Sequence, residues 1–242
     1  MSGKTFKAIG NDTPAITIRN CHNVRIVQND FIDDAEPIFV TDSTDVTIEY
    51  NRYRNIAGPH ERNGSNRGNF TQWVNSTGGS ISHNSGSGGD TEDIISIYKS
   101  GGHDAGNPLV IADNRFEGTN WTSGSGSGMM LGDGGGSHVV VKDNVLVNPG
   151  QVGIGVAGGS DIRVTGNTIL GQPRASSNVG IYVWGQDAGC SDIQVAGNTV
   201  DFAKPSGMKS GGWDGGNCGA ISGWSSNDWT AGVGLGAVRV VL

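Results

Sequence analysis

The sequence predicts an all-β solenoid of about eight coils in one elongated domain. The first observation is an asparagine-centred motif that returns along most of the chain at steps of 22 to 33 residues. Steps of that length, with apolar residues alternating at period two and no helical spacing between them, are typical of β-solenoids. The second observation is the content of 42 glycines, which lie between the apolar stretches without the three-residue period of collagen. These glycines are expected at corners and loops.

The repeated motif has apolar residues five and three positions before the asparagine and two positions after it. The clearest copy contains Ile162, Val164, Asn167 and Ile169. The marker residues are Asn29, Asn51, Asn84, Asn114, Asn144, Asn167 and Asn198, with the weakest copy around Asn84. Alternation points the apolar side chains into the coil. We expect the asparagine itself to turn the corner with a left-handed backbone, and stacked asparagines to hydrogen-bond as a ladder.

The repeat indicates a single domain over residues 1–242 with irregular ends. Residues 1–14 carry no motif and are expected to form a frayed or truncated start. Residues 203–242 lack a clean repeat and are expected to form an irregular C-terminal cap. That segment contains Trp213, Trp224 and Trp229, which suit an aromatic plug over the last coil.

Composition argues against two classes of partner. The net charge is -7 and no basic run occurs, which disfavours a nucleic-acid partner. No run of about 18 apolar residues is present, so no membrane span is predicted. The first residues do not read as a signal peptide, yet the Asn/Gly/Ser/Thr-rich composition favours a secreted or extracellular protein.

The three cysteines, Cys21, Cys190 and Cys218, fit no zinc spacing. Cys190 and Cys218 are separated by about one coil. A disulfide across neighbouring coils and a pair of thiols are both consistent with this spacing.

The strand before each asparagine-marked strand predicts a shallow groove on one wall. When these strands are aligned from coil to coil, Trp73, Tyr98 and Trp184 fall in an outward column with small residues between them. Large aromatic side chains on a surface usually serve binding, and sugar rings stack on their faces. The same alignment places Lys99 beside Asp133 on adjacent coils, either as catalytic groups or as an ordinary surface ion pair.

Charged segments supply further candidate site residues, and the first of them is expected at one end of the predicted groove. The loop between residues 55 and 68 contains His60, Arg62 and Arg67, which could supply donors to a substrate carboxylate. The hard oxygen ligands of a candidate Ca²⁺ site are Asp90, Glu92 and Asp93. A third cluster, Asp33, Asp34 and Glu36, is predicted to be a solvated turn.

Across residues 15 to 200 the asparagine-cornered repeats resemble the right-handed parallel β-helix of the pectate-lyase-like superfamily. The resemblance implies a single-stranded β-helix with a polysaccharide or oligosaccharide partner, since many members are lyases, hydrolases or epimerases acting in a groove on one exposed sheet. Neither the paired-aspartate signature of polygalacturonase-type hydrolases nor the aspartate set of calcium-dependent pectate lyases is found here.

The leading functional hypothesis is a polysaccharide lyase or epimerase that acts on a uronate-containing glycan by proton abstraction. Lys99 would be the base, although Asp133 beside it would raise the pKa of Lys99. His60 is the substitute base, and Arg62 or Arg67 would neutralise developing charge. The alternatives are a non-catalytic glycan-binding or adhesin-like protein, a structural solenoid, and a glycoside hydrolase with Asp133 and Glu92 as its carboxylate pair.

Overall fold

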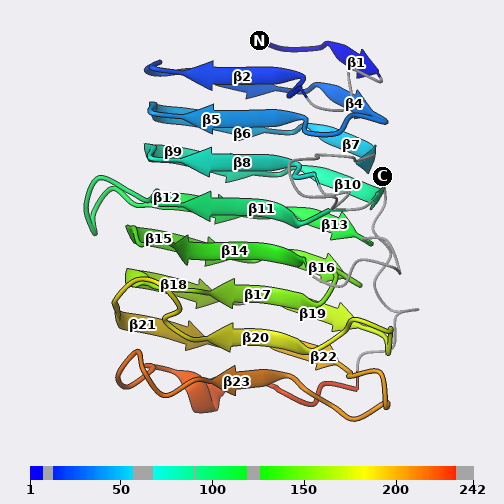
Figure 1. Cartoon of the computed structure of the whole chain (residues 1–242), viewed down its shortest axis with the longest axis vertical. Coiled ribbons are helices and arrows are strands. Elements are labelled where there is room, and N and C mark those ends of the chain that lie inside the picture. The colour runs from blue at the N-terminus through cyan, green and yellow to red at the C-terminus, as the bar shows by residue number, and fades with distance from the viewer. Residues whose placement is uncertain (8–12, 57–67, 90, 119–125, 233–242) are drawn as a thin grey trace.

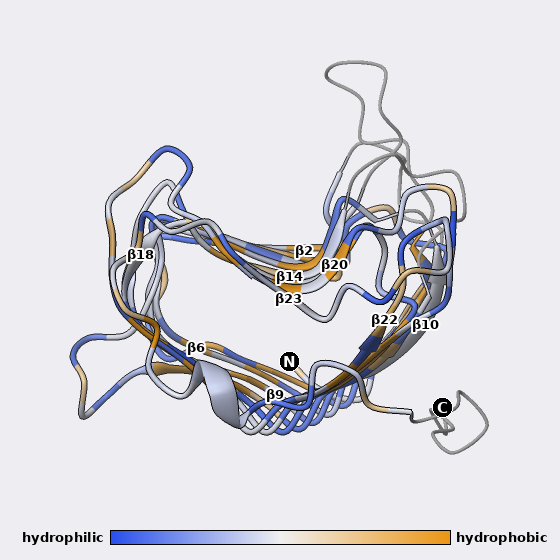
Figure 2. Cartoon of the chain, turned by 90° about the horizontal axis from the view of Figure 1, so that it is seen from below, coloured by the Kyte–Doolittle hydropathy of each residue, from blue (hydrophilic) through white to orange (hydrophobic). Residues whose placement is uncertain are grey.

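A computed structural model describes residues 1–7, 13–56, 68–89, 91–118 and 126–232. The chain winds into a parallel β-helix in which each full coil contributes one strand to each of three parallel sheets (Figure 1). Seen along its axis, the three sheets enclose a common interior (Figure 2). The predicted fold class and the estimate of about eight coils are confirmed.

The three sheets are numbered by the order in which the full coils enter them. Sheet 1 contains β2 (Ile16–Arg19), β5 (Ile38–Thr41), β8 (Thr71–Val74), β11 (Asp93–Tyr98), β14 (Ser127–Asp133), β17 (Val152–Val156), β20 (Val179–Val183) and β23 (Gly212–Asp214). Sheet 2 contains β3 (Arg25–Val27), β6 (Thr44–Glu49), β9 (Thr77–Ser82), β12 (Leu109–Ala112), β15 (Ser137–Lys142), β18 (Gly159–Thr165) and β21 (Cys190–Ala196). Sheet 3 contains β1 (Thr5–Lys7), β4 (Asp30–Ile32), β7 (Arg52–Ile56), β10 (Ser85–Gly89), β13 (Arg115–Glu117), β16 (Val145–Val147), β19 (Thr168–Gly171) and β22 (Thr199–Phe202). A short 3₁₀ helix, η1 (Trp224–Ser226), follows β23.

The asparagine ladder is confirmed and is one residue longer than expected. Each side-chain Nδ2 donates to the Oδ1 of the asparagine on the next coil, from Asn29 as far as Asn227, at distances of 2.7 to 3.1 Å. The left-handed residue, however, is the one before the asparagine, for example Tyr50 and Asp143, both with φ 56°. The expectation that the asparagine itself adopts this conformation is therefore wrong. Its buried amide instead bonds the main chain, as when Asn51 Nδ2 donates to Ile26 O at 2.8 Å.

Replacing Asn144 with alanine is expected to lower the free energy of unfolding by about 3–5 kcal/mol, since several buried hydrogen bonds are lost together. Its amide bonds both adjacent ladder asparagines and two main-chain carbonyls, and its side chain is fully buried. Urea denaturation measures the change. Lys142→Ala, an exposed substitution two residues away, is the control and is expected to cost less than about 0.5 kcal/mol. Equal effects of the two substitutions would contradict a stabilising ladder.

The third coil keeps a dense core although its sequence places glycines at apolar positions. A Cβ atom at Gly86 would come within 2.0 Å of the Tyr53 ring, so that ring fills the space left by the missing side chain. From the opposite wall, Trp73 and Phe70 fill the interior, and both are fully buried. The weak motif copy around Asn84 is thus compensated by large aromatic residues.

The described parts of both ends pack against the coil. In the part of the start that is described, β1 pairs with β4, and the rings of Phe6 and Phe31 stack with centroids 5.0 Å apart. Within the C-terminal cap, Trp224 and Trp229 pack together and against the end of the core, as expected of a plug. Trp213 does not join them, because β23 places it on the outer face of sheet 1.

Two of the three acidic side chains after β4 are buried. Asp34 is 1% exposed and Glu36 is 9% exposed, so the predicted solvated turn is wrong for these two residues, whereas Asp33 is exposed. The turn packs beneath Gly68, where an added Cβ would collide with the carbonyl oxygen of Ala35. Burial raises the pKa of Glu36 to about 7.

Within the described residues, no helix is long and apolar enough to cross a membrane.

Candidate functional site

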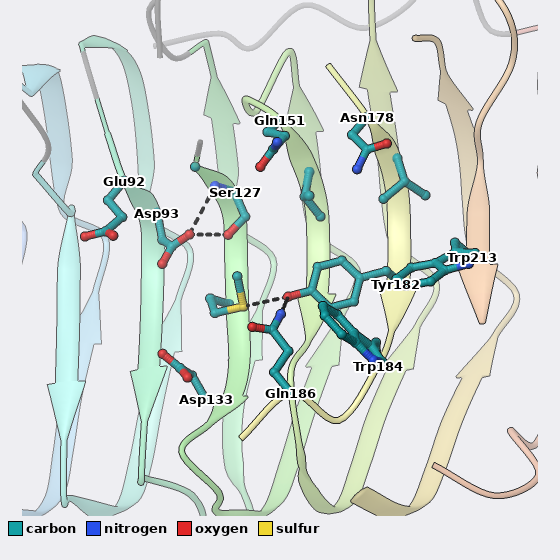
Figure 3. A pocket seen from close by; sticks show the side chains of 14 residues that line it. Glu92, Asp93, Ser127, Asp133, Gln151, Asn178, Tyr182, Trp184, Gln186 and Trp213 are labelled. Carbon is teal, nitrogen blue, oxygen red and sulfur yellow. Dashed lines mark hydrogen bonds between the residues drawn. The ribbon is translucent and has the colours of Figure 1, made fainter. Parts of the chain in front are cut away.

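A groove of about 350 Å³ lies on the outer face of sheet 1, across β11 to β23 (Figure 3). Acidic side chains lie at its β11–β14 end, and aromatic side chains lie toward β23. Its lining residues are Glu92, Asp93, Gly126, Ser127, Met130, Asp133, Gln151, Val152, Asn178, Val179, Tyr182, Trp184, Gln186 and Trp213.

The floor of the groove is a small apolar cluster outside the core of the coil. It consists of Val152, Val179 and Tyr182, with Met130 packed against them. The ring of Tyr182 lies across Gly155, where an added Cβ would be 2.6 Å from the ring. Its hydroxyl donates to Met130 Sδ at 3.2 Å and accepts from Gln186 Nε2 at 2.9 Å. These contacts hold the tyrosine flat along the wall.

Two indoles form an exposed platform at the other end. Trp184 is 41% exposed and Trp213 is 48% exposed, and their ring centroids are 5.8 Å apart at an interplanar angle of 58°. Tyr182 extends this platform, with its centroid 6.3 Å from that of Trp213. The three rings come from adjacent strands, β20 and β23, or from the residue that follows β20. We refer to Trp184 and Trp213 as the indole platform.

Asp93 is a buried carboxyl group at the acidic end. Its Oδ1 accepts hydrogen bonds from the Ser127 hydroxyl and from the Ser127 main-chain N–H, the latter at 3.0 Å. Burial raises the pKa of Asp93 to about 7, and the charges of Glu92 and Asp133 add to the rise, while the bonds from Ser127 oppose it. Asp93 is therefore protonated at mildly acidic pH.

Asp133 stands on the neighbouring strand and is the second carboxyl group of this end (Figure 3). Partial burial raises its pKa, the charge of Asp187 adds to this, and a hydrogen bond from the main chain at Gly134 opposes it. The two carboxyls thus differ in environment, since Asp93 is enclosed and Asp133 is only half-buried. Different environments let one carboxyl stay protonated while the other ionises.

The position of Asp93 does not require an acid for folding. One coil earlier the equivalent residue is Asn69, whose Oδ1 accepts the main-chain N–H of Asp93 at 3.3 Å, as Asp93 Oδ1 accepts that of Ser127. An amide therefore makes the same main-chain contact without the cost of burying a charge. The ionised form of a carboxyl at this position is less favourable for folding than an amide would be. The presence of a carboxyl here therefore favours a role in function.

The raised pKa of Asp93 predicts a specific pH dependence of stability. The Asp93 carboxyl ionises near its ordinary pKa in the unfolded chain and near pH 7 in the folded chain. Its contribution to the free energy of unfolding is therefore fully present below about pH 4 and is lost as the pH rises to about 7. Asp93→Asn is expected to remove this contribution and to raise the melting temperature at pH 8 more than at pH 4. Thermal unfolding followed by circular dichroism measures this difference. An equal shift at both pH values would contradict a raised pKa.

The predicted outward position of Trp73 is wrong, because this side chain is fully buried in the core. The alignment assumed that Phe70 stands beside Ile38, whereas Thr71 occupies that register position. Trp73 therefore pairs with Val40 and Ile97, both of which point inward. A register error of one residue moves every side chain of a strand to the other face.

Lys99 and Tyr98 lie beside the groove and are not among its lining residues. An irregularity in β14 sets Asp133 opposite Tyr98, one residue away from the predicted partner Lys99. The exposed Lys99 ammonium lies 5.0 Å from the centroid of the Tyr98 ring, and its main-chain N–H donates to the Asp133 carbonyl at 2.8 Å. The main chains of Lys99 and Asp133 are therefore in contact on adjacent coils, as predicted, with an offset of one residue in the pairing.

The remaining predicted residues divide into two groups. Trp184, Asp133, Glu92 and Asp93 line the groove. His60, Arg62, Arg67 and Asp90 lie outside the described residues. Within the described ranges, no group of three or more His, Cys, Asp or Glu side chains is arranged to hold a metal ion, so a Ca²⁺ site stays a prediction.

Sequence reasoning missed Tyr182 and Trp213. Tyr182 has a visible signal, because it alternates with the inward Ile181 and Val183. Trp213 has none, because its strand lies in the segment without a motif.

A family model described as "Right handed beta helix region" matches residues 15–200. The chain belongs to this family. The match spans β2 to β21 of the right-handed β-helix, whereas Trp213 lies beyond it. Comparisons with curated proteins and with solved structures give no match. Family membership therefore supports the coil architecture, whereas the possible chemistry depends on the residues that line the groove.

Proposed function

We propose that this right-handed β-helix protein binds a neutral glycan in the sheet 1 groove and hydrolyses it, with Asp93 as the general acid. A sugar ring has apolar faces and a hydroxyl edge. The indole platform and the apolar floor suit its faces. The side-chain amides of Gln151, Asn178 and Gln186 supply donors and acceptors for its hydroxyl groups.

The observation that carries the proposal is a pair of carboxyl groups at the acidic end of the groove, the buried Asp93 and the more exposed Asp133. Glycoside hydrolysis uses one carboxylic acid to protonate the leaving oxygen and one carboxylate to activate water or attack the anomeric carbon. A pKa of about 7 keeps Asp93 protonated at mildly acidic pH, as the acid requires. Asp133 takes the second role. Both Ser127 bonds fall on Asp93 Oδ1, which leaves Oδ2 to carry the proton.

The charge of the lining favours hydrolysis of a neutral glycan over the lyase or epimerase reaction on a uronate. The described lining contains Glu92, Asp93 and Asp133 and neither lysine nor arginine. Such a wall repels a polyanion and lacks a group to neutralise the charge that develops on proton abstraction. The lyase hypothesis still has candidate cations in Arg62 and Arg67, which lie outside the described residues.

A panel of neutral, cationic and uronate-containing polysaccharides tests the proposal. We expect new reducing ends from a neutral glycan without the absorbance of unsaturated products. Unsaturated products from a uronate polymer would contradict the proposal and support the lyase. Binding of a glycan without any product would contradict the catalytic part and support a glycan-binding protein. The same panel with Asp42→Asn, a substitution of an exposed carboxylate just after β5 and away from the lining, serves as the control.

A further inference from the structure

Two segments are joined beside the indole platform by a covalent and a polar link. Cys190 and Cys218 form a disulfide, with their Cα atoms 4.5 Å apart. Next to it, the Asn217 side chain makes two hydrogen bonds with Gly185, accepting its N–H at 3.0 Å and donating to its carbonyl at 2.7 Å. The two links tie the turn after β20 and the start of β21 to the segment after β23.

Each joined segment carries groove residues or directly follows one. The turn after β20 begins with Trp184 and contains Gln186, which bonds the Tyr182 hydroxyl. Trp213 lies in β23, directly before the second segment, and Gly215 of that segment lies so close to Trp184 that an added Cβ would be 2.7 Å from the indole. Relative motion of the two segments would therefore separate the two indoles.

The strand that holds Trp213 has few supports besides these two links, and one of them is the Trp229 ring, which lies against Gly212. Among the residues that the structure describes, β23 contains three residues, is the last strand of sheet 1 and pairs only with β20. All three of its residues are exposed. Because few buried contacts hold such a strand, its position depends strongly on the links that follow it.

We infer that the Cys190–Cys218 disulfide and Asn217 form a clamp that positions the indole platform, so that the redox state of this cysteine pair sets the affinity of the groove. The binding part of this inference rests on the proposed function. Reduction by an added dithiol such as dithiothreitol cleaves the S–S bond with two electrons and two protons. The products are two protein thiols and the cyclic disulfide of dithiothreitol. Cys190, Cys218 and Asn217 act through the indoles and are positioning residues.

The clamp is tested first without any glycan. Coupled indoles give a circular dichroism couplet. The part of this signal that is lost in Trp213→Phe is the platform couplet, whereas the Trp224–Trp229 pair, with centroids 4.5 Å apart, contributes to the part that remains. We expect dithiothreitol to abolish this couplet in the wild-type protein while the far-ultraviolet β signal persists, and reoxidation to restore it. The double variant Cys190→Ser, Cys218→Ser is the control: it should lack the couplet already and show no response to dithiothreitol.

Binding is measured second, with the neutral glycan identified by the polysaccharide panel. Reduction is expected to raise KM and Kd at least tenfold and to change kcat at saturation much less, because the Asp93–Ser127 contact lies outside the clamp. Asn217→Ala, which keeps the disulfide, is expected to raise Kd in the same direction by a smaller factor.

The outcomes separate the clamp from the proposed function. An unchanged couplet and unchanged Kd after verified reduction would overturn the clamp. A couplet that responds to reduction in a protein that binds no glycan would uphold the clamp and refute the function. If reduction unfolds the coil, Asn217→Ala decides: an unchanged couplet and Kd in that variant would overturn the clamp.

Discussion

Asp93→Asn is expected to lower kcat for glycan hydrolysis by about 10²- to 10⁴-fold, since it removes the proton donor to the leaving oxygen. An asparagine keeps the Oδ1 acceptor for Ser127, so the groove should retain its shape and the glycan its Kd. In the wild-type protein the same group sets the alkaline limb of the pH–activity profile. Activity should fall as pH rises through about 7, where Asp93 loses its proton.

The comparison for this variant is Asp133→Asn, which removes the carboxylate and keeps the acid. Asp133→Asn is expected to lower kcat to a similar degree. Its residual activity should still fall as pH rises through about 7, because Asp93 is present. Reducing-end assays across pH 4 to 9 measure both profiles. Wild-type rates in Asp93→Asn, or an alkaline limb that the substitution does not remove, would contradict the assignment of Asp93 as the acid.

Trp73→Ala is expected to lower the free energy of unfolding by about 3–5 kcal/mol, because it empties the volume of the largest side chain that is fully buried in the described part of the chain. The same substitution should leave glycan Kd unchanged, since Trp73 faces Val40 and Ile97 inside the coil. Denaturation in urea and binding of the glycan provide the two measurements.

Trp184→Ala is the matched control, because it removes the same side chain from the same sheet at an exposed position. It is expected to lower stability by less than about 1 kcal/mol and to weaken glycan binding strongly. The opposite pattern, in which Trp73→Ala affects binding and Trp184→Ala affects stability, would contradict the register of β8.

The coil could be predicted from the sequence because its cause is local and repeated. An asparagine such as Asn167, with apolar residues at fixed distances, makes the same contacts on every coil, so each copy supports the others. The pattern does not separate the asparagine from the residue before it, so the left-handed backbone at the corner is predicted one residue too late. Gly166 and Gly197, which precede two of the markers with φ 65° and 63°, were the available signal.

The groove was predicted only in part, because its geometry depends on register. Trp184 follows a regular strand and was placed correctly on the surface. Trp73 follows a long insertion, which left the pairing of β8 undetermined by one residue. The irregularity in β14 moved Asp133 in the same way. The raised pKa of Asp93 arises from burial between coils, which the sequence does not display.

The most direct test of the catalytic proposal is the pKa of Asp93 itself. In protein labelled with ¹³C at aspartate carboxyl carbons, the resonance lost in Asp93→Asn identifies this group, and its shift is followed from pH 3 to 9. A midpoint near 7 is the result expected for a buried acid that donates its proton to a glycan. A midpoint near 4 would show an ordinary carboxylate, and the proposed acid would be contradicted.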